Sequence, residues 1–440
     1  MYTDVDSIPH RAPASMLEWG VVFFLLYASF SHPLFVQYFF PSGVYKIGFV
    51  FCFLTVLSLL VLRLMSGAYG YRLGIRWNMV LLIGAWMFYL GCTTIATILH
   101  ADDSAAAELF LAYVKVIAAI MIFMVLTVDL YCWTLDRYTN LVFIGAATSA
   151  VVVLLVFVGV MEPLGEVGVG GIGATTREFY GLSLGWGQLP IPGSAYSIIR
   201  LQSFADEPGT FAFMLLLGIV WAFHRGWRWH VVVMSVALFL TWSVGALLAG
   251  MVLLLAYLAK RGSIKLFVAS FVVAALVLSV YQSNADLVDI VTRYLETKNG
   301  EAAERLDSVG DRVEYIDKLQ KLIDKHPEGV GLGVHAVGFT SPVGWLVPLS
   351  DSGVLGFVFY CVAGGILLVL ALRTALFYQG KCRVLGIMVL VLAFSALQRA
   401  RIDYSVWHFW LLTGFLKIYL HHSMMRSQVV VLQDTGGALI

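Results

Sequence analysis

The stretch WLVPLSDSGVLGFVFYCVAGGILLVLAL, residues 345–372, is the part of the chain that decides its fold class. It contains a single charged side chain, that of Asp351. An α-helix needs about 20 mostly apolar residues to cross the hydrocarbon core of a bilayer. The stretch is longer than that, so it predicts a transmembrane helix.

The composition of the whole chain agrees with this prediction. Of its 440 residues, 60% are hydrophobic and 12% are charged, whereas a soluble domain has about 45–50% and 25%. Charged side chains at this frequency are too few to cover a water-soluble surface. Water-soluble classes are therefore excluded, and the net charge of +1 gives no sign of nucleic-acid binding.

Apolar stretches of comparable length recur along the chain and predict an all-α polytopic integral membrane protein with about 11–12 transmembrane helices. The stretch at 231–259 has a break at 242–245, so it is either one long helix or two short limbs that meet inside the membrane. The other predicted spans are 17–40, 44–65, 78–99, 108–128, 140–160, 208–223, 264–281, 384–397 and 405–420.

Lys and Arg concentrate in short loops that face the cytoplasm. In this chain, Lys- and Arg-rich loops occur at every second connection between predicted spans when the 231–259 stretch is counted as two limbs. Both termini then face the cytoplasm, and two long loops face the opposite, outer side. The predicted parts are N-terminal helices at 1–160, a Gly-rich outer loop at 161–207, central helices at 208–281, an outer helical loop at 282–344, and C-terminal helices with a cytoplasmic tail at 345–440.

The outer loop at 282–344 is predicted to be a small solvated unit, because it holds 11 acidic and 7 basic side chains. Apolar residues recur at helical spacing within 301–325 and predict an amphipathic helix there. The glycines of the following segment, 326–335, indicate either a tight turn back to the membrane or backbone N–H groups for an anionic ligand. A nucleotide site is rejected, because no strand precedes these glycines and no Lys follows them.

Several arginines are predicted on the outer side. The short loop with Arg399 and Arg401 faces outward by the alternation, although short translocated loops rarely carry arginine. Planar guanidinium groups suit phosphate and pyrophosphate, because they donate two parallel hydrogen bonds to such anions. The candidate anion-binding residues are Arg200, Arg305, Arg312, Arg399 and Arg401.

Three of these arginines have a purely structural alternative. Arg200 could form an ion pair with Asp206 or Glu207, and Arg305 and Arg312 could lie on the solvated face of the amphipathic helix. Metal binding is not predicted, because no Cys, His or Asp spacing in the sequence is typical of a metal site.

Four motifs, in their order along the chain, resemble those of the O-antigen polymerase and O-antigen ligase superfamily. The resemblance extends over about residues 195–372, and the large outer loop late in the chain also fits it. The motifs are Arg200-x-x-Ser203-Phe204-x-x-Glu207-Pro208-x-x-Phe211-Ala212, Gly245-Ala246-Leu247-Leu248-Ala249, Pro327-x-Gly329-x-Gly331-x-Gly333 and Trp345-Leu346-x-x-Leu349-x-Asp351-x-Gly353-Val354-Leu355-Gly356.

The resemblance implies a metal-independent glycosyltransferase without a cofactor, in the bacterial inner membrane and with its active site facing the periplasm. The donor would be a glycan on undecaprenyl pyrophosphate, whose leaving group the arginines would stabilise. Glu207 or His335 would accept the proton of the attacking hydroxyl. Each also has a structural alternative, since Glu207 could cap its helix and His335 could support a turn. Membrane lipids are expected partners, and a chain-length regulator protein is a further candidate.

Polymerase is favoured over ligase by one departure from the family pattern. Ligases carry His-Asn shortly before the position of Trp345, where this chain has Pro342-Val343. A polymerase would join the glycan to the non-reducing end of another lipid-linked repeat unit, whereas a ligase would join it to lipid A-core. A membrane transporter is the alternative from another class, because the break at 242–245 is typical of discontinuous transporter helices.

Overall fold

The structure is a computed structural model that describes part of the 440-residue chain. The described residues are 13, 15–31, 54, 57, 58, 61, 77–100, 113, 117, 123, 126–169, 175–180, 183–190, 197–203, 205, 208–241, 243, 246, 247, 249–251, 318–331, 346–398 and 410–420. The helices are α1 (Met16–Ser31), α4 (Trp77–His100), α6 (Val128–Phe157), α7 (Pro208–His224), α8 (Arg228–Leu240), α13 (Val347–Phe377) and α14 (Gly380–Gln398). Residues 318–325 and 410–420 are also helical.

Three helices of the described part are long and apolar enough to cross a bilayer, namely Val80–His100, Val128–Val156 and Val347–Phe377. Large apolar side chains such as Leu81, Ile95 and Ile98 are largely exposed on α4. Exposed apolar surface of this extent is typical of contact with lipid. The predicted polytopic, helical membrane architecture is confirmed.

The largest hydrophobic core of the described residues, here called the main core, is formed by buried residues of α1, α6, α7, α8 and α14 among others, and α7 lies in its middle. Its residues from Phe211 to Leu217 are all buried, because α6, α8 and α14 surround it. A helix that is apolar all round must be enclosed by protein or lipid. Gly218 brings α8 close, since a Cβ there would lie 2.9 Å from the sulfur of Met234.

Helix α6 is longer than the sequence predicted. The expected span began at residue 140, whereas α6 begins at Val128, where the side chain of Thr127 caps it by accepting from the backbone N–H of Leu130. Asp136 lies between the predicted spans 108–128 and 140–160, but in the structure it is part of α6. Its carboxylate accepts hydrogen bonds from Trp221 (2.8 Å) and Arg225 (3.1 Å) at the end of α7. These bonds allow the helix to continue through a charged position.

Helices α4 and α13 form a second, closely packed pair that α14 connects to the main core. Phe88 stacks on Phe359 with ring centroids 4.8 Å apart. At Gly356 a Cβ would lie 2.9 Å from the Cβ of Cys92, so the two backbones approach closely. Small residues at such contacts are typical of helix pairs in membranes.

The Gly-rich segment 161–207 contains a β-sheet, which corrects the all-α prediction for that segment. Strands β1 (Gly165–Val169), β2 (Thr175–Phe179), β3 (Leu184–Pro190) and β4 (Ser197–Ser203) form one antiparallel sheet in the order β1-β2-β3-β4. Glycine is unfavourable in strands, so the segment gave a weak strand signal. Pairing between sequential neighbours needs only short connections, and it stabilises these strands despite their glycines.

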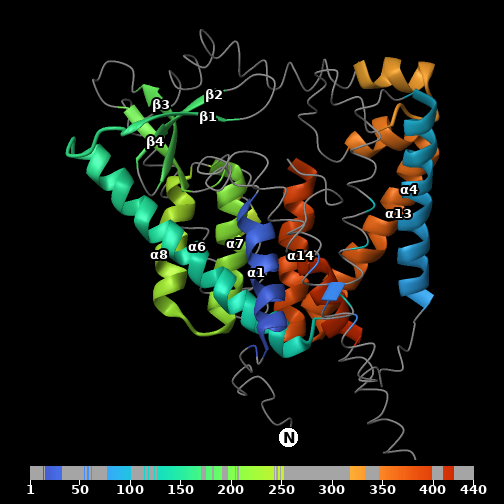
Figure 1. The fold of residues 1–440 in the computed structure, drawn as a ribbon, viewed down its shortest axis with the longest axis horizontal. Helices are drawn as coiled ribbons and strands as arrows, with labels where there is room; N and C mark the ends of the chain where they lie inside the picture. Colours follow the sequence, from blue (N-terminus) through green and yellow to red (C-terminus); the bar gives the residue numbers. More distant parts are fainter. Residues whose placement is uncertain are drawn as a thin grey trace, which may run out of the picture.

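The sheet and the helix at 318–325 lie at the same end of the membrane helices, at the top of Figure 1. Strand β4 contacts α6 and α7, and the bond from the Ser203 hydroxyl to the Gly145 carbonyl (3.2 Å) ties its last residue to α6. The sheet and the helix at 318–325 belong to the two long loops that the charge alternation predicts on one side of the membrane.

Candidate functional site

The turn at residues 326–331 docks on the first turns of α13. It follows the helix at 318–325 and reverses the chain toward the membrane helices. Three backbone hydrogen bonds fix it, from Val330 N–H to the Ser350 carbonyl (2.9 Å), from Gly331 N–H to the Asp351 carbonyl (3.0 Å) and from Val354 N–H to the Pro327 carbonyl (3.0 Å). The turn is therefore held by α13 itself.

Three glycines make this docking possible. Gly329 (φ 86°), Gly331 (φ 76°) and Gly353 (φ 65°) all adopt left-handed backbone conformations that favour glycine. A Cβ on Gly331 would lie 2.6 Å from the backbone nitrogen of Thr97 in α4. One on Gly353 would lie 2.7 Å from the Glu328 carbonyl oxygen. The turn, α4 and α13 thus meet backbone to backbone.

The glycine N–H groups of the turn already have partners. That of Gly329 donates to the His326 carbonyl (2.9 Å), and that of Gly331 donates to Asp351. Of the two interpretations that the sequence allowed for these glycines, the structure supports the tight turn. Gly333 lies outside the described residues.

Asp351 is fully buried where α13 is interrupted. The helix is non-helical at Gly353, and the hydroxyls of Ser350 and Ser352 bond to the carbonyls of Val347 (2.7 Å) and Pro348 (2.6 Å). A carboxyl in a membrane helix is costly unless it faces protein or a cavity. The motif around Asp351 therefore marks the docking point of the turn.

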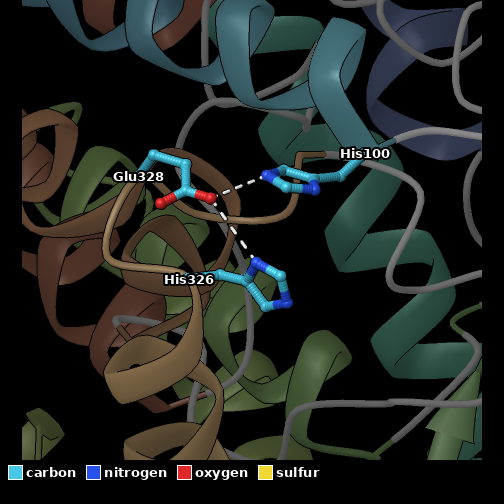
Figure 2. Close-up of side chains that lie close together, drawn as sticks. All are labelled: His100, His326 and Glu328. Atoms are coloured by element: carbon cyan, nitrogen blue, oxygen red, sulfur yellow. Dashed lines mark hydrogen bonds and ion pairs between the residues drawn. The ribbon is translucent and has the colours of Figure 1, made fainter.

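His326 and Glu328 of this turn form a cluster with His100 of α4 (Figure 2). The Oε1 atom of Glu328 lies 2.8 Å from Nε2 of His100 and 3.4 Å from Nδ1 of His326. The two imidazoles meet edge to face with centroids 4.8 Å apart. His100 is the last residue of α4, so the cluster links α4 to the turn.

The hydrogen bonds of the cluster favour the ionised form of Glu328. A bond from its own backbone N–H and a bond from His100 lower the pKa of Glu328, and His326 adds to this effect. Glu328 is therefore an ionised acceptor at neutral pH. The side chains are partly accessible, with 26% exposure for both histidines and 41% for Glu328. Two imidazoles and one carboxylate can hold a metal ion or transfer protons.

Sequence reasoning missed this cluster. His100 ends a predicted span, and its partners lie beyond the middle of the chain. The short spacing of His326 and Glu328 was visible, but it is too common to indicate a site. The missing information is the packing of α4 on α13, which depends on tertiary contacts.

Most of the residues predicted for anion binding and proton transfer lie outside the described residues. The exception is Arg200, whose backbone lies in β4 opposite Trp186 of β3, three residues before the anchored Ser203. The predictions for the others are untested, namely those for Glu207, Arg305, Arg312, His335, Arg399 and Arg401.

A comparison with known families decides the broader assignment. Residues 229–342 match the family model described as O-Antigen ligase. Over these residues the chain is similar to the O-antigen ligase family. The family domain is shared by polymerases and ligases, so the predicted resemblance to the superfamily is confirmed while the two reactions are not separated.

The family domain covers only part of the region in which the motifs were found. It begins in α8 and ends beyond the turn at 326–331, so it includes His326 and Glu328. Two of the motifs, around Arg200 and Asp351, lie outside the O-antigen ligase family match. No curated protein matches the chain.

Proposed function

We propose that this protein is a polysaccharide polymerase of the O-antigen type. It transfers a growing glycan from undecaprenyl pyrophosphate to the non-reducing end of another lipid-linked repeat unit, at the periplasmic face of the bacterial inner membrane. The observation that carries this proposal is the O-antigen ligase family domain within a multi-pass membrane protein. Its family implies a transferase of lipid-linked glycans.

In the proposed reaction, a hydroxyl of the acceptor sugar attacks the anomeric carbon of the donor glycan. The bond from that carbon to the pyrophosphate oxygen breaks, and undecaprenyl pyrophosphate leaves with the electron pair. Glu207 or His335 takes the proton of the hydroxyl. Arginines stabilise the charge on the leaving group, so the transfer requires no metal ion.

Arg200 is the strongest candidate for the pyrophosphate contact, followed by Arg312 and then by Arg305, Arg399 and Arg401. Support for Arg200 comes from its place in β4, an element fixed to α6 through Ser203. Groups that stabilise a transition state act best from a rigid element. The sheet also lies at the same end of the molecule as the helix at 318–325 (Figure 1).

Polymerase is preferred to ligase because Pro342-Val343 occupies the position of the ligase His-Asn. Purified protein in lipid nanodiscs, given lipid-linked single repeat units alone, should produce a ladder of longer glycans. A ligase would require lipid A-core as an acceptor, and a transporter would produce no new glycosidic bond. The ladder should persist with a chelator present.

The arginine assignment has its own test in the same assay. Arg200→Ala and Arg312→Ala should each lower the rate of chain extension at least tenfold. Arg373→Ala, at the expected cytoplasmic end of α13, is the control and should leave the rate unchanged. Full activity of both test variants would contradict the assignment of these arginines.

A further inference from the structure

We propose that His100, His326 and Glu328 form a binding site for a divalent metal ion of the zinc class. Nothing in the proposed glycosyl transfer requires this site. The inference therefore goes beyond the proposed function and is independent of it.

The geometry of the three side chains carries the proposal. Their ligand atoms, one from each residue, all lie within 4.8 Å of one another. Two of the separations are 2.8 Å and 3.4 Å, from Glu328 Oε1 to His100 Nε2 and to His326 Nδ1. With zinc–nitrogen and zinc–oxygen bonds of about 2.0–2.2 Å, neighbouring ligands in a tetrahedral site lie roughly 3.3 Å apart. Small side-chain rotations bring the cluster to that geometry.

The backbone that carries these ligands is fixed before any ion binds. His326 and Glu328 belong to the turn that three hydrogen bonds attach to α13. His100 lies three residues after Thr97, the residue of α4 against which Gly331 packs. All three side chains therefore belong to one packed unit, and preorganised ligands lose little freedom when they bind an ion.

The ligand types select the metal. Imidazole nitrogens suit zinc and its neighbours in the first transition row, whereas magnesium and calcium prefer sites made of oxygen atoms. Two histidines and one glutamate leave the fourth position of a tetrahedral zinc site to water or another ligand. The partial exposure of all three side chains gives an ion a route from solvent.

The consequence of binding is a metal bridge between α4 and the turn. The ion replaces the hydrogen bonds that Glu328 now makes with the two imidazoles. Because the unfolded chain does not bring these residues together, the ion stabilises the folded state by mass action. The bound ion therefore holds the turn against α4.

The test is a zinc titration of the full-length protein in nanodiscs, with any affinity tag removed and bound metal stripped by a chelator. A competing chromophoric chelator reports the affinity, and elemental analysis reports the stoichiometry. The wild type should bind one more equivalent of Zn²⁺ than Glu328→Gln or His100→Gln. If these variants still bind that equivalent, the wild type should bind it at least tenfold more tightly. Excess Mg²⁺ should not compete for it.

Two further measurements keep the result independent of folding defects. Zn²⁺ should raise the melting temperature of the wild type and not that of Glu328→Gln, whose amide keeps the shape of the side chain. Co²⁺ in the wild-type site should give visible absorption typical of four-coordinate cobalt. His230→Ala is the control, because His230 bonds to Asn140 (2.9 Å) away from the cluster; it should bind like the wild type. Equal zinc binding by the wild type and both cluster variants would overturn the proposal, and so would no binding by any of them.

Discussion

The carboxylate of Glu328 lies 2.8 Å from the imidazole of His100, which connects the end of a membrane helix to a turn far along the chain. His100 ends α4, while Glu328 belongs to the turn that α13 holds by backbone hydrogen bonds. The contact closes a unit of three elements at the end of the molecule where the sheet also lies (Figure 1). The match to the O-antigen ligase family ends at residue 342, between the turn and α13.

The contact should make stability depend on pH. Because its hydrogen bonds lower the pKa of Glu328 in the folded state, the ionised carboxylate stabilises the fold above the pKa of the unfolded chain. That stabilisation is lost as the pH falls through the lower, folded-state pKa. Glu328→Gln should therefore have a lower melting temperature than the wild type at pH 7, and the difference should shrink below about pH 4.5. A difference that stays constant from pH 7 to pH 3 would contradict the assigned role of the carboxylate.

The glycines of the turn should be intolerant of a methyl group. Gly331→Ala combines a left-handed backbone with a clash against the backbone of Thr97, so it should destabilise the protein by about 2–4 kcal/mol. Gly365→Ala in α13 is the matched control, since nothing lies within 4 Å of its added Cβ. The control should be neutral or slightly stabilising because alanine favours helices. Thermal unfolding in detergent measures both, and equal melting temperatures would contradict the docked turn.

The ion pair at the other end of the main core should contribute measurably to stability. Asp136 and Arg225 contact each other at 3.0 Å, with side chains only 15% and 24% exposed. Asp136→Asn should cost about 1–3 kcal/mol, because it also weakens the bond from Trp221. A double-mutant cycle with Arg225→Ala isolates the pair. If the stability loss of the double variant equals the sum of the losses of the two single variants, the ion pair contributes no interaction energy of its own.

Ser203 should matter for both stability and activity if β4 positions Arg200. Its hydroxyl donates to the Gly145 carbonyl of α6 from a buried position, so Ser203→Ala should cost about 1 kcal/mol. In the nanodisc assay it should also slow chain extension, as Arg200→Ala does but less severely. Thr148→Ala removes a hydroxyl that donates to the Ile144 and Gly145 carbonyls of its own helix, and it serves as the control because it leaves the bond from β4 in place. Wild-type extension by Ser203→Ala would contradict the positioning role of β4.

The sequence predicted the membrane helices well, because hydropathy alone decides them. Residues 78–99 and 208–223 correspond to α4 and α7 within about one residue at each end. The sheet was missed because its strands contain many glycines and gain stability from pairing. The start of α6 was missed because a charged residue such as Asp136 is unfavourable in a membrane helix unless it has partners, and its partners Trp221 and Arg225 are distant in sequence.

The candidate site was less predictable than the fold. The motif glycines were correctly singled out, but their purpose depends on the backbones of α4 and α13, which no local pattern specifies. The cluster of His100, His326 and Glu328 depends on the same packing. Arg200 was predicted from its residue type and its place on the outer side, and its role is still a prediction.

The polysaccharide profile of a bacterial strain from which the gene has been deleted distinguishes a polymerase from a ligase directly. If the protein is a polymerase, the lipopolysaccharide of this strain should carry single repeat units, and complementation should restore the ladder of long chains. If the lipopolysaccharide instead carries no O-antigen while long glycans accumulate on the lipid carrier, the protein is a ligase and the account of its reaction is wrong.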